Sequence, residues 1–277
     1  MENKIPKVIH YIWLGGNPLP EKEQKCLASW KKFCPDYEIK LWNEKNFDIE
    51  KSCDYVKEAY KNKKFAFVAD YIRMFALYSE GGIYMDTDVE LLKPFDDLLQ
   101  YDFFSSFENM VMVNPAIVGA KKGNIVIKTI MEDYHERSFY LDKKKTKINM
   151  LPIPITSSVI LKNIFSVELN NKFQVVDFKG TSICLLPCDY YHAQDYVSGE
   201  IVITKNTRGI HRYAASWLSG KEKRSDKFVA NVRKFFGEKT FRKIMKMFLK
   251  IRVKRYTKKY KKGGKLARMK ERVMKEM

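Results

Sequence analysis

The chain has 277 residues, 45% of them hydrophobic, which suits one large packed domain or one domain with an extension. Its net charge of +19 is unevenly spread: residues 221–277 hold 23 of the 52 Lys and Arg but 5 of the 33 Asp and Glu, so residues 1–220 are near neutral. No stretch approaches the ~20 apolar residues of a membrane-spanning helix. The opening MENKIPK precedes about six or seven apolar residues, which predicts no signal peptide. The five cysteines are scattered and lack zinc-site spacing, so we expect reduced thiols, as in a cytosolic protein.

The hydrophobic pattern of residues 1–220 predicts strands that alternate with helices. In chain order we expect a strand at 7–13, a helix at 21–34, a strand at 37–42, helices at 48–62 and 65–79, strands at 83–86, 103–108 and 116–120, helices at 124–135 and 156–165, and strands at 173–178, 181–186 and 200–204. Such alternation favours a mostly parallel sheet that binds ligands at the carboxyl ends of its strands. We therefore predict an α/β domain over residues 1–220 and a basic helical extension over residues 221–277.

Acidic side chains follow the apolar strand at 83–86. Asp86 and Asp88 can hold one divalent ion, which prefers hard oxygen ligands. A D-x-D triplet alone is common and is usually not a metal site. In the preceding helix, Asp70 and Arg73 are three residues apart and share one helix face. They form either an ordinary surface ion pair or, because their neighbours are apolar, a packed pair that a polar ligand completes.

Two further positions have a structural and a functional interpretation. Trp13 ends the first strand, before a Gly15-Gly16 pair that permits close approach of the backbone to a ligand. A Trp at a strand end usually belongs to the core. Asn114 precedes Pro115, where it either forms a turn or faces a ligand.

The run over residues 66–88, A-x-x-A-D-Y-x-R-x-x-x-L-Y-x-x-G-G-I-Y-x-D-x-D, resembles the signature of the D-x-D sugar transferases of glycosyltransferase family thirty-two. Residues 5–16 are similar to that family's first strand and donor loop, and residues 210–217 to its closing H-x-x-x-x-S-W segment. The family includes capsule, lipopolysaccharide and yeast mannosyl transferases, and the large glucosylating toxins of bacteria are more distant relatives. The matches follow family order over residues 5–217.

This resemblance implies a Rossmann-like fold of the GT-A type. It implies a metal-dependent, retaining transfer of a sugar from a nucleotide-sugar, with UDP-sugars favoured, to a hydroxyl of a surface-glycan acceptor of the capsule or lipopolysaccharide type. The implied cofactor is Mn(2+), with Mg(2+) as the alternative. Asp88 would bind the metal directly, Asp86 would bind the metal or the donor ribose, and His211 would be a third ligand. No nucleophile stands out, so we expect front-face transfer in which the departing phosphate helps to deprotonate the acceptor.

The same resemblance assigns the remaining site residues. Trp13 would stack on uracil, with the turn at Gly15 near the nucleotide. The residues that would hold the donor sugar, or lie near the donor, are Asp70, Arg73 and Asn114. Ser216 would reach the metal, and Trp217 would donate its indole N–H to the leaving phosphate, which makes it catalytic together with Asp86 and Asp88. The segment at 152–158 departs from the Gly-Pro pair that relatives often carry there, which leaves the acceptor contacts open.

Residues 221–277 require a separate interpretation. Apolar residues between 228 and 249 recur at spacings of three and four, with Lys and Arg opposite them. This pattern is typical of a helix at an anionic membrane surface. A helix that packs on the body is the alternative, and the apolar stripe argues against nucleic acid. We expect a cytoplasmic protein that attaches peripherally to the membrane through residues 221–277.

Two other classes of protein were weighed. A degenerate transferase fold could serve as a membrane- or nucleic-acid-binding module through the basic tail, but the signature residues, among them Asp88, Arg73 and Trp217, are intact. A metal-dependent phosphoesterase usually needs more ligands than the four histidines of this chain readily supply.

Overall fold

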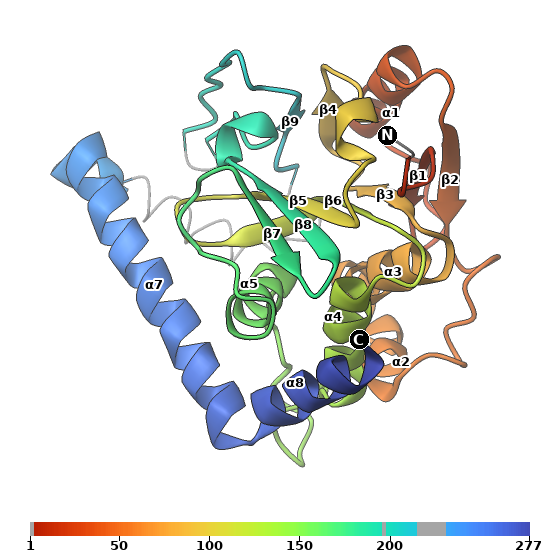
Figure 1. Cartoon of the computed structure of the whole chain (residues 1–277), viewed down its shortest axis with the longest axis vertical. Coiled ribbons are helices and arrows are strands. Elements are labelled where there is room, and N and C mark those ends of the chain that lie inside the picture. The colour runs from red at the N-terminus through yellow and green to blue at the C-terminus, as the bar shows by residue number, and fades with distance from the viewer. Residues whose placement is uncertain (1–2, 196–197, 215–230) are drawn as a thin grey trace.

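The computed structural model describes residues 3–195, 198–214 and 231–277, in which seven strands form one sheet in the order β2-β1-β3-β6-β5-β8-β7 (Figure 1). The strands in that order are β2 (Glu38–Trp42), β1 (Val8–Ile12), β3 (Gly82–Met85), β6 (Val113–Ala120), β5 (Phe103–Phe107), β8 (Thr181–Leu186) and β7 (Gln174–Phe178). Strand β1 pairs in parallel with both β2 and β3, and β5 pairs in parallel with β8. Strands β6 and β7 are antiparallel to their neighbours, so the other five strands point the same way. The mostly parallel α/β fold predicted from the sequence is confirmed.

Helices cover both faces of this sheet. The helices are α1 (Glu21–Phe33), α2 (Asp54–Lys61), α3 (Phe65–Glu80), α4 (Ile125–His135), α5 (Ile153–Asn163), α7 (Glu238–Lys262) and α8 (Lys265–Glu276), with short 3-10 turns at Asp96–Leu98 and Cys188–Tyr190. Successive strand residues enter opposite cores, as expected for a pleated strand: Tyr84 packs with α3 and α4, whereas Ile83 and Met85 pack with Trp30 of α1. The sheet is therefore the middle layer between two apolar cores.

A second, two-stranded ladder lies beside α1. Strand β4 (Val89–Leu91) pairs antiparallel with β9 (Gly209–His211). The buried Trp30 indole N–H of α1 donates to the carbonyl of Val89 at 2.7 Å, and Ser29 Oγ accepts from the Leu91 amide at 2.8 Å. These three-residue strands are too short for a periodic signal, so the sequence did not predict them.

Two predicted elements differ from the structure. The strand expected at 200–204 is wrong: this segment forms only an isolated bridge at Ile201, with backbone hydrogen bonds to Ala193 and Asp195, and the Thr204 amide donates to Thr207 Oγ1. The helix expected at 48–62 is shorter and begins at Asp54. Residues 48–52 instead form a turn in which Asp48 accepts from the amides of Glu50 and Lys51.

The C-terminal helices lie against the body rather than free of it. Figure 1 shows α7 running along one side of the molecule and α8 returning beneath α4. Apolar side chains of both helices are buried in the same core as α3, α4 and α5: Val253, Tyr260, Leu266, Met269 and Val273. Among the described residues, no helix is both long enough and apolar enough to cross a bilayer.

A pair of glycines makes the turn from α3 into β3. Gly82 has a φ of +106°, and a Cβ placed on it would lie 2.7 Å from the carbonyl oxygen of Val8 and 2.9 Å from His10 Nε2. Both the backbone angle and the space therefore require glycine. Gly16 has a φ of +70°, but nothing lies within 4 Å of a Cβ there.

We predict that Gly82→Ala lowers the free energy of unfolding by about 2–5 kcal/mol, because left-handed strain and a backbone clash add. The matched control Gly16→Ala carries only the strain and should cost about 1–2 kcal/mol. Urea denaturation of both variants measures the difference. Equal losses of unfolding free energy in the two variants would show that Val8 and His10 of β1 move away from the added methyl group without an energetic cost.

Candidate active site

The site residues lie beyond the carboxyl ends of neighbouring strands. Strands β1 and β3 are parallel partners, with Ile9 opposite Ile83 and His10 opposite Tyr84, so their carboxyl ends meet at one edge of the sheet. The segment that starts at Asp86 follows β3 at this edge. Its first amide donates to the carbonyl of Ala116 on β6 at 2.8 Å, which fixes the direction in which the acidic segment leaves the sheet.

The β4–β9 ladder brings together two side chains that are far apart in the sequence. Val89 is opposite His211, and the Arg212 amide donates to the carbonyl of Asp88 at 2.9 Å. As a result, Nε2 of the buried His211 lies 3.3 Å from Oδ1 of Asp88. Ligand atoms of Asp86, Asp88 and His211 all lie within 4.8 Å of one another.

Asp88 and His211 perturb each other's protonation. Burial alone would raise the pKa of Asp88, but the charge and hydrogen bond of His211, together with the Ala214 amide at 2.8 Å, hold it below the usual value. Burial would lower the pKa of His211, but the Asp88 carboxylate raises it. Asp88 is therefore a charged ligand at neutral pH.

Asp86 is held from the opposite side. Its Oδ1 accepts from the Tyr84 hydroxyl at 2.6 Å and lies 3.2 Å from the Arg73 guanidinium. Arg73 also lies 3.0 Å from Asp70 and donates to the carbonyl of Pro115 at 2.7 Å. Its guanidinium carbon stands 4.5 Å from the centroid of the Tyr84 ring. Arg73 thus joins α3 to the ends of β3 and β6.

The ion pair of Asp70 and Arg73 is buried, so it is not an exposed surface pair. The two residues are 8% and 6% exposed. Burial raises the pKa of Asp70 to about 6, against the lowering effect of Arg73. Arg73 Nε has no hydrogen-bond partner among the described residues.

Some of the other predicted residues lie at the same strand edge, and two lie outside the described residues. Trp13 follows β1, is partly exposed, and donates its indole N–H to the carbonyl of Asn17 at 2.6 Å. The Gly15 amide donates to Glu44 Oε1 at 2.7 Å. Asn114 is buried on β6, directly before the carbonyl that Arg73 binds, and its Oδ1 accepts from the Ala116 amide at 3.1 Å. Ser216 and Trp217 lie outside the described residues.

Several polar groups around the site were not assigned to it from the sequence. His192 packs with its ring centroid 5.3 Å from that of His211, and its Nδ1 lies 3.0 Å from the Tyr213 hydroxyl. Tyr213 itself has a φ of 50°, a strained angle for a residue with a side chain. Glu108 follows β5, and burial raises its pKa against the effect of His211. Tyr84 could have been found, because residues at i and i+2 share a strand face.

This donor set fits a divalent cation. Two carboxylates and one imidazole suit Mn(2+), and the carboxylates also suit Mg(2+). His211 Nδ1 is buried without a hydrogen-bond partner among the described residues, so the ring orientation depends on the contact of Nε2 with Asp88. One Asp86 oxygen is engaged by Arg73 and Tyr84, which leaves its second oxygen for an ion or a ribose hydroxyl.

Known proteins are similar to the part of the chain that contains Asp70, Arg73, Asp86 and Asp88. Residues 20–104 match the family model described as the glycosyltransferase sugar-binding region containing a DXD motif. Inositol phosphoceramide mannosyltransferase 3 of Schizosaccharomyces pombe is 32% identical over 123 residues, which is 43% of this chain and 34% of that protein. Subversion of eukaryotic traffic protein A of Legionella pneumophila is 26% identical over 163 residues, covering 47% of this chain and 25% of that protein. The chain thus spans about a quarter to a third of these relatives.

A solved structure titled PaToxG Glycosyltransferase aligns over 57% of this chain and 68% of its own, with a TM-score of 0.46 and 20% identity. The family match runs from α1 to the start of β5 and includes the acidic segment and the buried Arg73 described above. Through this segment, the chain is similar to the glycosyltransferases whose sugar-binding region contains a DXD motif.

Proposed function

We propose that this protein is a metal-dependent, retaining glycosyltransferase. The observation that carries the proposal is the convergence of Asp86, Asp88 and His211 beside the buried Asp70–Arg73 pair, within the family's DXD region. The donor would be a nucleotide-sugar, with UDP-sugars favoured, and the acceptor a hydroxyl of a surface glycan on a lipid carrier. The curated relatives include mannosyltransferases that are named for a lipid, inositol phosphoceramide, which supports a lipid-linked acceptor.

The proposed chemistry needs negative charge to be stabilised on a departing diphosphate. A divalent ion, with Mn(2+) favoured, would supply this as a Lewis acid. Asp88 and His211 would hold it, and Asp86 would bind the ion or the donor ribose through its second oxygen. From its position in the family motif, Trp217 would donate its indole N–H to the leaving phosphate, while Ser216 would reach the metal.

The buried pair and the strand edge would orient the donor. Asp70 would accept hydrogen bonds from sugar hydroxyls, and Arg73, already fixed by Asp86 and the Pro115 carbonyl, would present its remaining N–H groups. Trp13 would stack on the base, with the Gly15 turn beside it and Asn114 near the sugar. These residues would hold the anomeric carbon open to an acceptor hydroxyl on the face from which the phosphate departs.

We predict that one donor in a panel of UDP- and GDP-sugars releases its nucleotide in the presence of Mn(2+), and that Asp88→Asn reduces this release by about 100-fold or more. Asp54→Asn, whose side chain is 95% exposed, is the matched control and should behave as wild type. Nucleotide release and calorimetry of UDP with and without Mn(2+) are the measurements. Absence of both turnover and UDP binding in wild type would refute the proposal, and an inverted anomer in the NMR spectrum of the product would refute retention.

The raised pKa of Asp70, about 6, makes a prediction about stability. The folded state binds the Asp70 proton more tightly than the unfolded state does. Protonation of Asp70 therefore stabilises the folded state fully below pH 4, and this stabilisation is lost as the pH rises through 6. Relative to Asp70→Asn, wild type should therefore lose about 2.4 kcal/mol of unfolding free energy between pH 4 and 7. Urea denaturation at four pH values tests this. A difference that stays constant with pH would show that Asp70 titrates normally.

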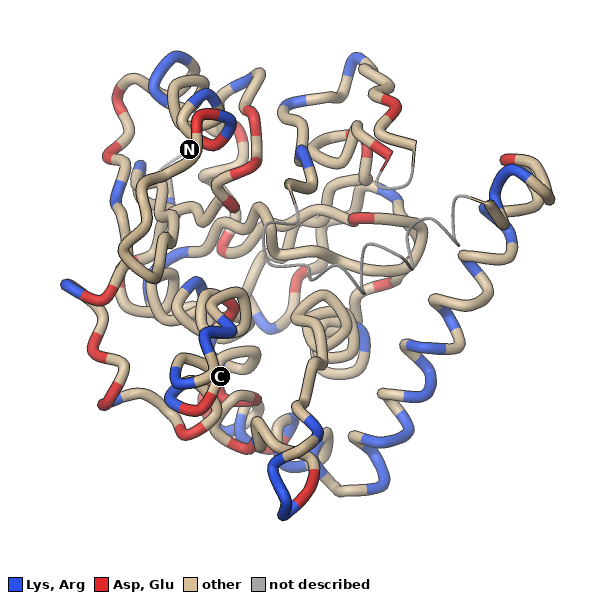
Figure 2. Tube along the Cα trace, turned by 180° about the vertical axis from the view of Figure 1, so that it is seen from behind, with Lys and Arg blue, Asp and Glu red and all other residues tan. Residues whose placement is uncertain are grey.

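The outward side of α7 supports an anionic membrane surface as the protein's location. The helix turns Val253 and Tyr260 toward the body, while Met247, Phe248 and Ile251 are 58%, 55% and 57% exposed. Lys and Arg recur along the helix (Figure 2), and Lys246, Lys250 and Arg252 are next to these apolar residues in the sequence. Apolar residues flanked by cations are what a helix needs to lie in the headgroup region of anionic lipid. Such a position would keep the site near a lipid-linked acceptor.

We predict that the protein sediments with vesicles that contain phosphatidylserine and not with phosphatidylcholine vesicles, and that 0.5 M salt weakens binding. Phe248→Ser/Ile251→Ser should reduce vesicle binding about tenfold, because two inserted side chains are lost. Met274→Ser on α8, 43% exposed, is the control. Unchanged binding by the double variant would remove this face from the proposal.

A further inference from the structure

The pairing of strand β6 with β5 is interrupted beside the active site. Two consecutive residues of β5, Ser105 and Ser106, are opposite Val118 and Asn114 of β6. Residues 115–117 therefore have no partner on β5, and we call them the β6 bulge. Strand β6 lies between β3 and β5, and proline has no N–H to give to a ladder. The proline that opens the bulge is therefore tolerated in this central strand because the ladder is interrupted there.

The β6 bulge binds two residues of the active site through its carbonyl groups. The carbonyl of Pro115 accepts from the Arg73 guanidinium at 2.7 Å, and that of Ala116 accepts from the Asp86 amide at 2.8 Å. The guanidinium of Arg73 and the carboxylate of Asp86 are themselves 3.2 Å apart. A bulge turns backbone groups away from the regular ladder, which makes these carbonyls available to the site. The position of the bulge therefore fixes both members of this ion pair.

Side chains next to the β6 bulge hold its backbone in place. Ser105 Oγ donates to the carbonyl of Ile117 at 3.1 Å, and Asn114 Oδ1 accepts from the Ala116 amide at 3.1 Å. Ser105 is buried, at 1% exposure. Buried backbone groups need hydrogen-bond partners, and those of a bulge do not find them in the ladder. The serine and asparagine side chains supply these partners instead.

Helix α5 holds the strand directly before the β6 bulge. Ser158 Oγ accepts from the Val113 amide at 2.9 Å and donates to the carbonyl of Pro154 at 2.6 Å. Ser158 is completely buried, so its loss would leave the Val113 amide without this partner inside the core. This serine belongs to the segment at 152–158, whose departure from the Gly-Pro pair of relatives is noted above. The hydroxyl at the end of that segment thus ties α5 to the strand that carries the bulge.

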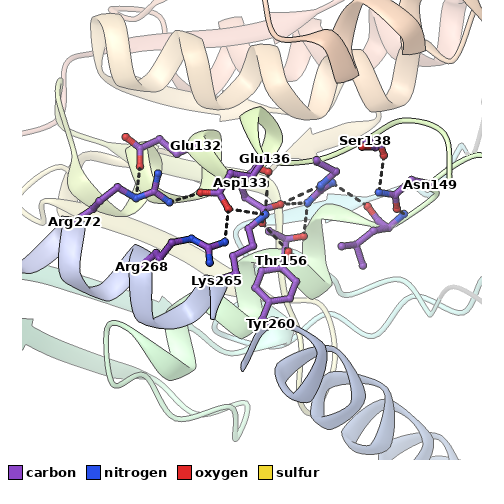
Figure 3. Close-up of polar contacts among 12 residues, drawn as sticks. Glu132, Asp133, Glu136, Ser138, Asn149, Thr156, Tyr260, Lys265, Arg268 and Arg272 are labelled. Atoms are coloured by element: carbon purple, nitrogen blue, oxygen red, sulfur yellow. Dashed lines mark hydrogen bonds and ion pairs between the residues drawn. The ribbon is translucent and has the colours of Figure 1, made fainter. Parts of the chain in front are cut away.

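A second hydroxyl of α5 makes its contacts on the other side of the helix (Figure 3). Thr156 Oγ1 accepts from Arg137 at 2.8 Å, and Arg137 pairs with Asp133 of α4. The Tyr260 hydroxyl and Lys265 Nζ of the C-terminal helices bind the same carboxylate, at 2.8 and 2.6 Å. Residues two positions apart do not share a helix face, so this threonine and the serine that binds β6 point in different directions. Both are completely buried, which makes the threonine a matched control.

We propose that Ser105 and Ser158 are positioning residues that hold the β6 bulge from two sides, and that the bulge sets the orientation of Arg73 and Asp86. The inference rests on the proposed function, in which Arg73 binds the donor and Asp86 binds the ion or the donor ribose. It gives the two serines a part in donor binding that passes through the backbone of β6.

The first test needs no substrate and measures hydrogen exchange of single amides by NMR. Ser158→Ala removes the partner of the Val113 amide and loosens the bulge, so the Asp86 amide should exchange about tenfold faster. Its rate is expressed relative to the amides of α1, so that a general loss of stability cancels. The control Thr156→Val removes an equally buried hydroxyl from the same helix and leaves this relative rate unchanged. Equal relative rates in the two variants would overturn the inference.

The second test approaches the bulge from β5 with Ser105→Ala, which removes a single oxygen atom. The variant should raise the KM for the donor about tenfold and change kcat less than about twofold, because contacts that orient the bound donor are weakened. Kinetic constants equal to those of wild type would overturn the inference, and so would a fall in kcat without a rise in KM. A wild type without donor turnover would refute the proposed function, while the exchange rate of the Asp86 amide still decides the inference.

Discussion

The buried guanidinium of Arg73 is the contact on which the geometry of the site depends. It neutralises Asp70 and Asp86 and binds the Pro115 carbonyl, so one side chain connects a helix to two strands that meet edge to edge. A buried cation needs such complete compensation, and each partner is therefore held at a defined distance from the others. The position of the acidic segment after β3 thus depends on the packing of α3. Helix α3 in turn packs in one core with the aromatic side chains of α4.

The site is assembled from two kinds of structure. Asp70, Arg73, Asp86 and Asp88 lie on one continuous helix–turn–strand unit, in which the two glycines set the direction of the chain. His211 comes from a short strand that reaches the unit through the β4–β9 ladder. The four residues of the helix–turn–strand unit are held firmly, because this unit is part of the main sheet and its core. His211 is positioned by three residue pairs, and its imidazole is fixed by the contact with Asp88.

These two origins explain what could be predicted from the sequence. The local unit has clear helical and strand periods around Gly81-Gly82, so its elements were predicted from spacing. Its acidic residues were singled out in the same way, but their roles in a site were assigned through the resemblance. His211 was found through the resemblance alone, because nothing in its surroundings marks a lone histidine as a neighbour of Asp88. Ser158, Glu108 and His192 depend on tertiary packing, which brings residues dozens of positions apart into contact. The apolar stripe of the tail was recognised as one face, but the fold divides it: Phe241 is buried and Phe248 is exposed.

The β4–β9 ladder also has a consequence for the order in which the protein is made. Leu91 leaves the ribosome well before its partner Gly209, and at ordinary rates of synthesis the delay is roughly 10 s. During that interval the first half of the sheet can pack against α1 and α3, while the outer edge of β4 has no strand beside it. The imidazole of His211 therefore reaches Asp86 and Asp88 after the strand before them has formed. The third candidate cation ligand is added late in the folding of the nascent chain.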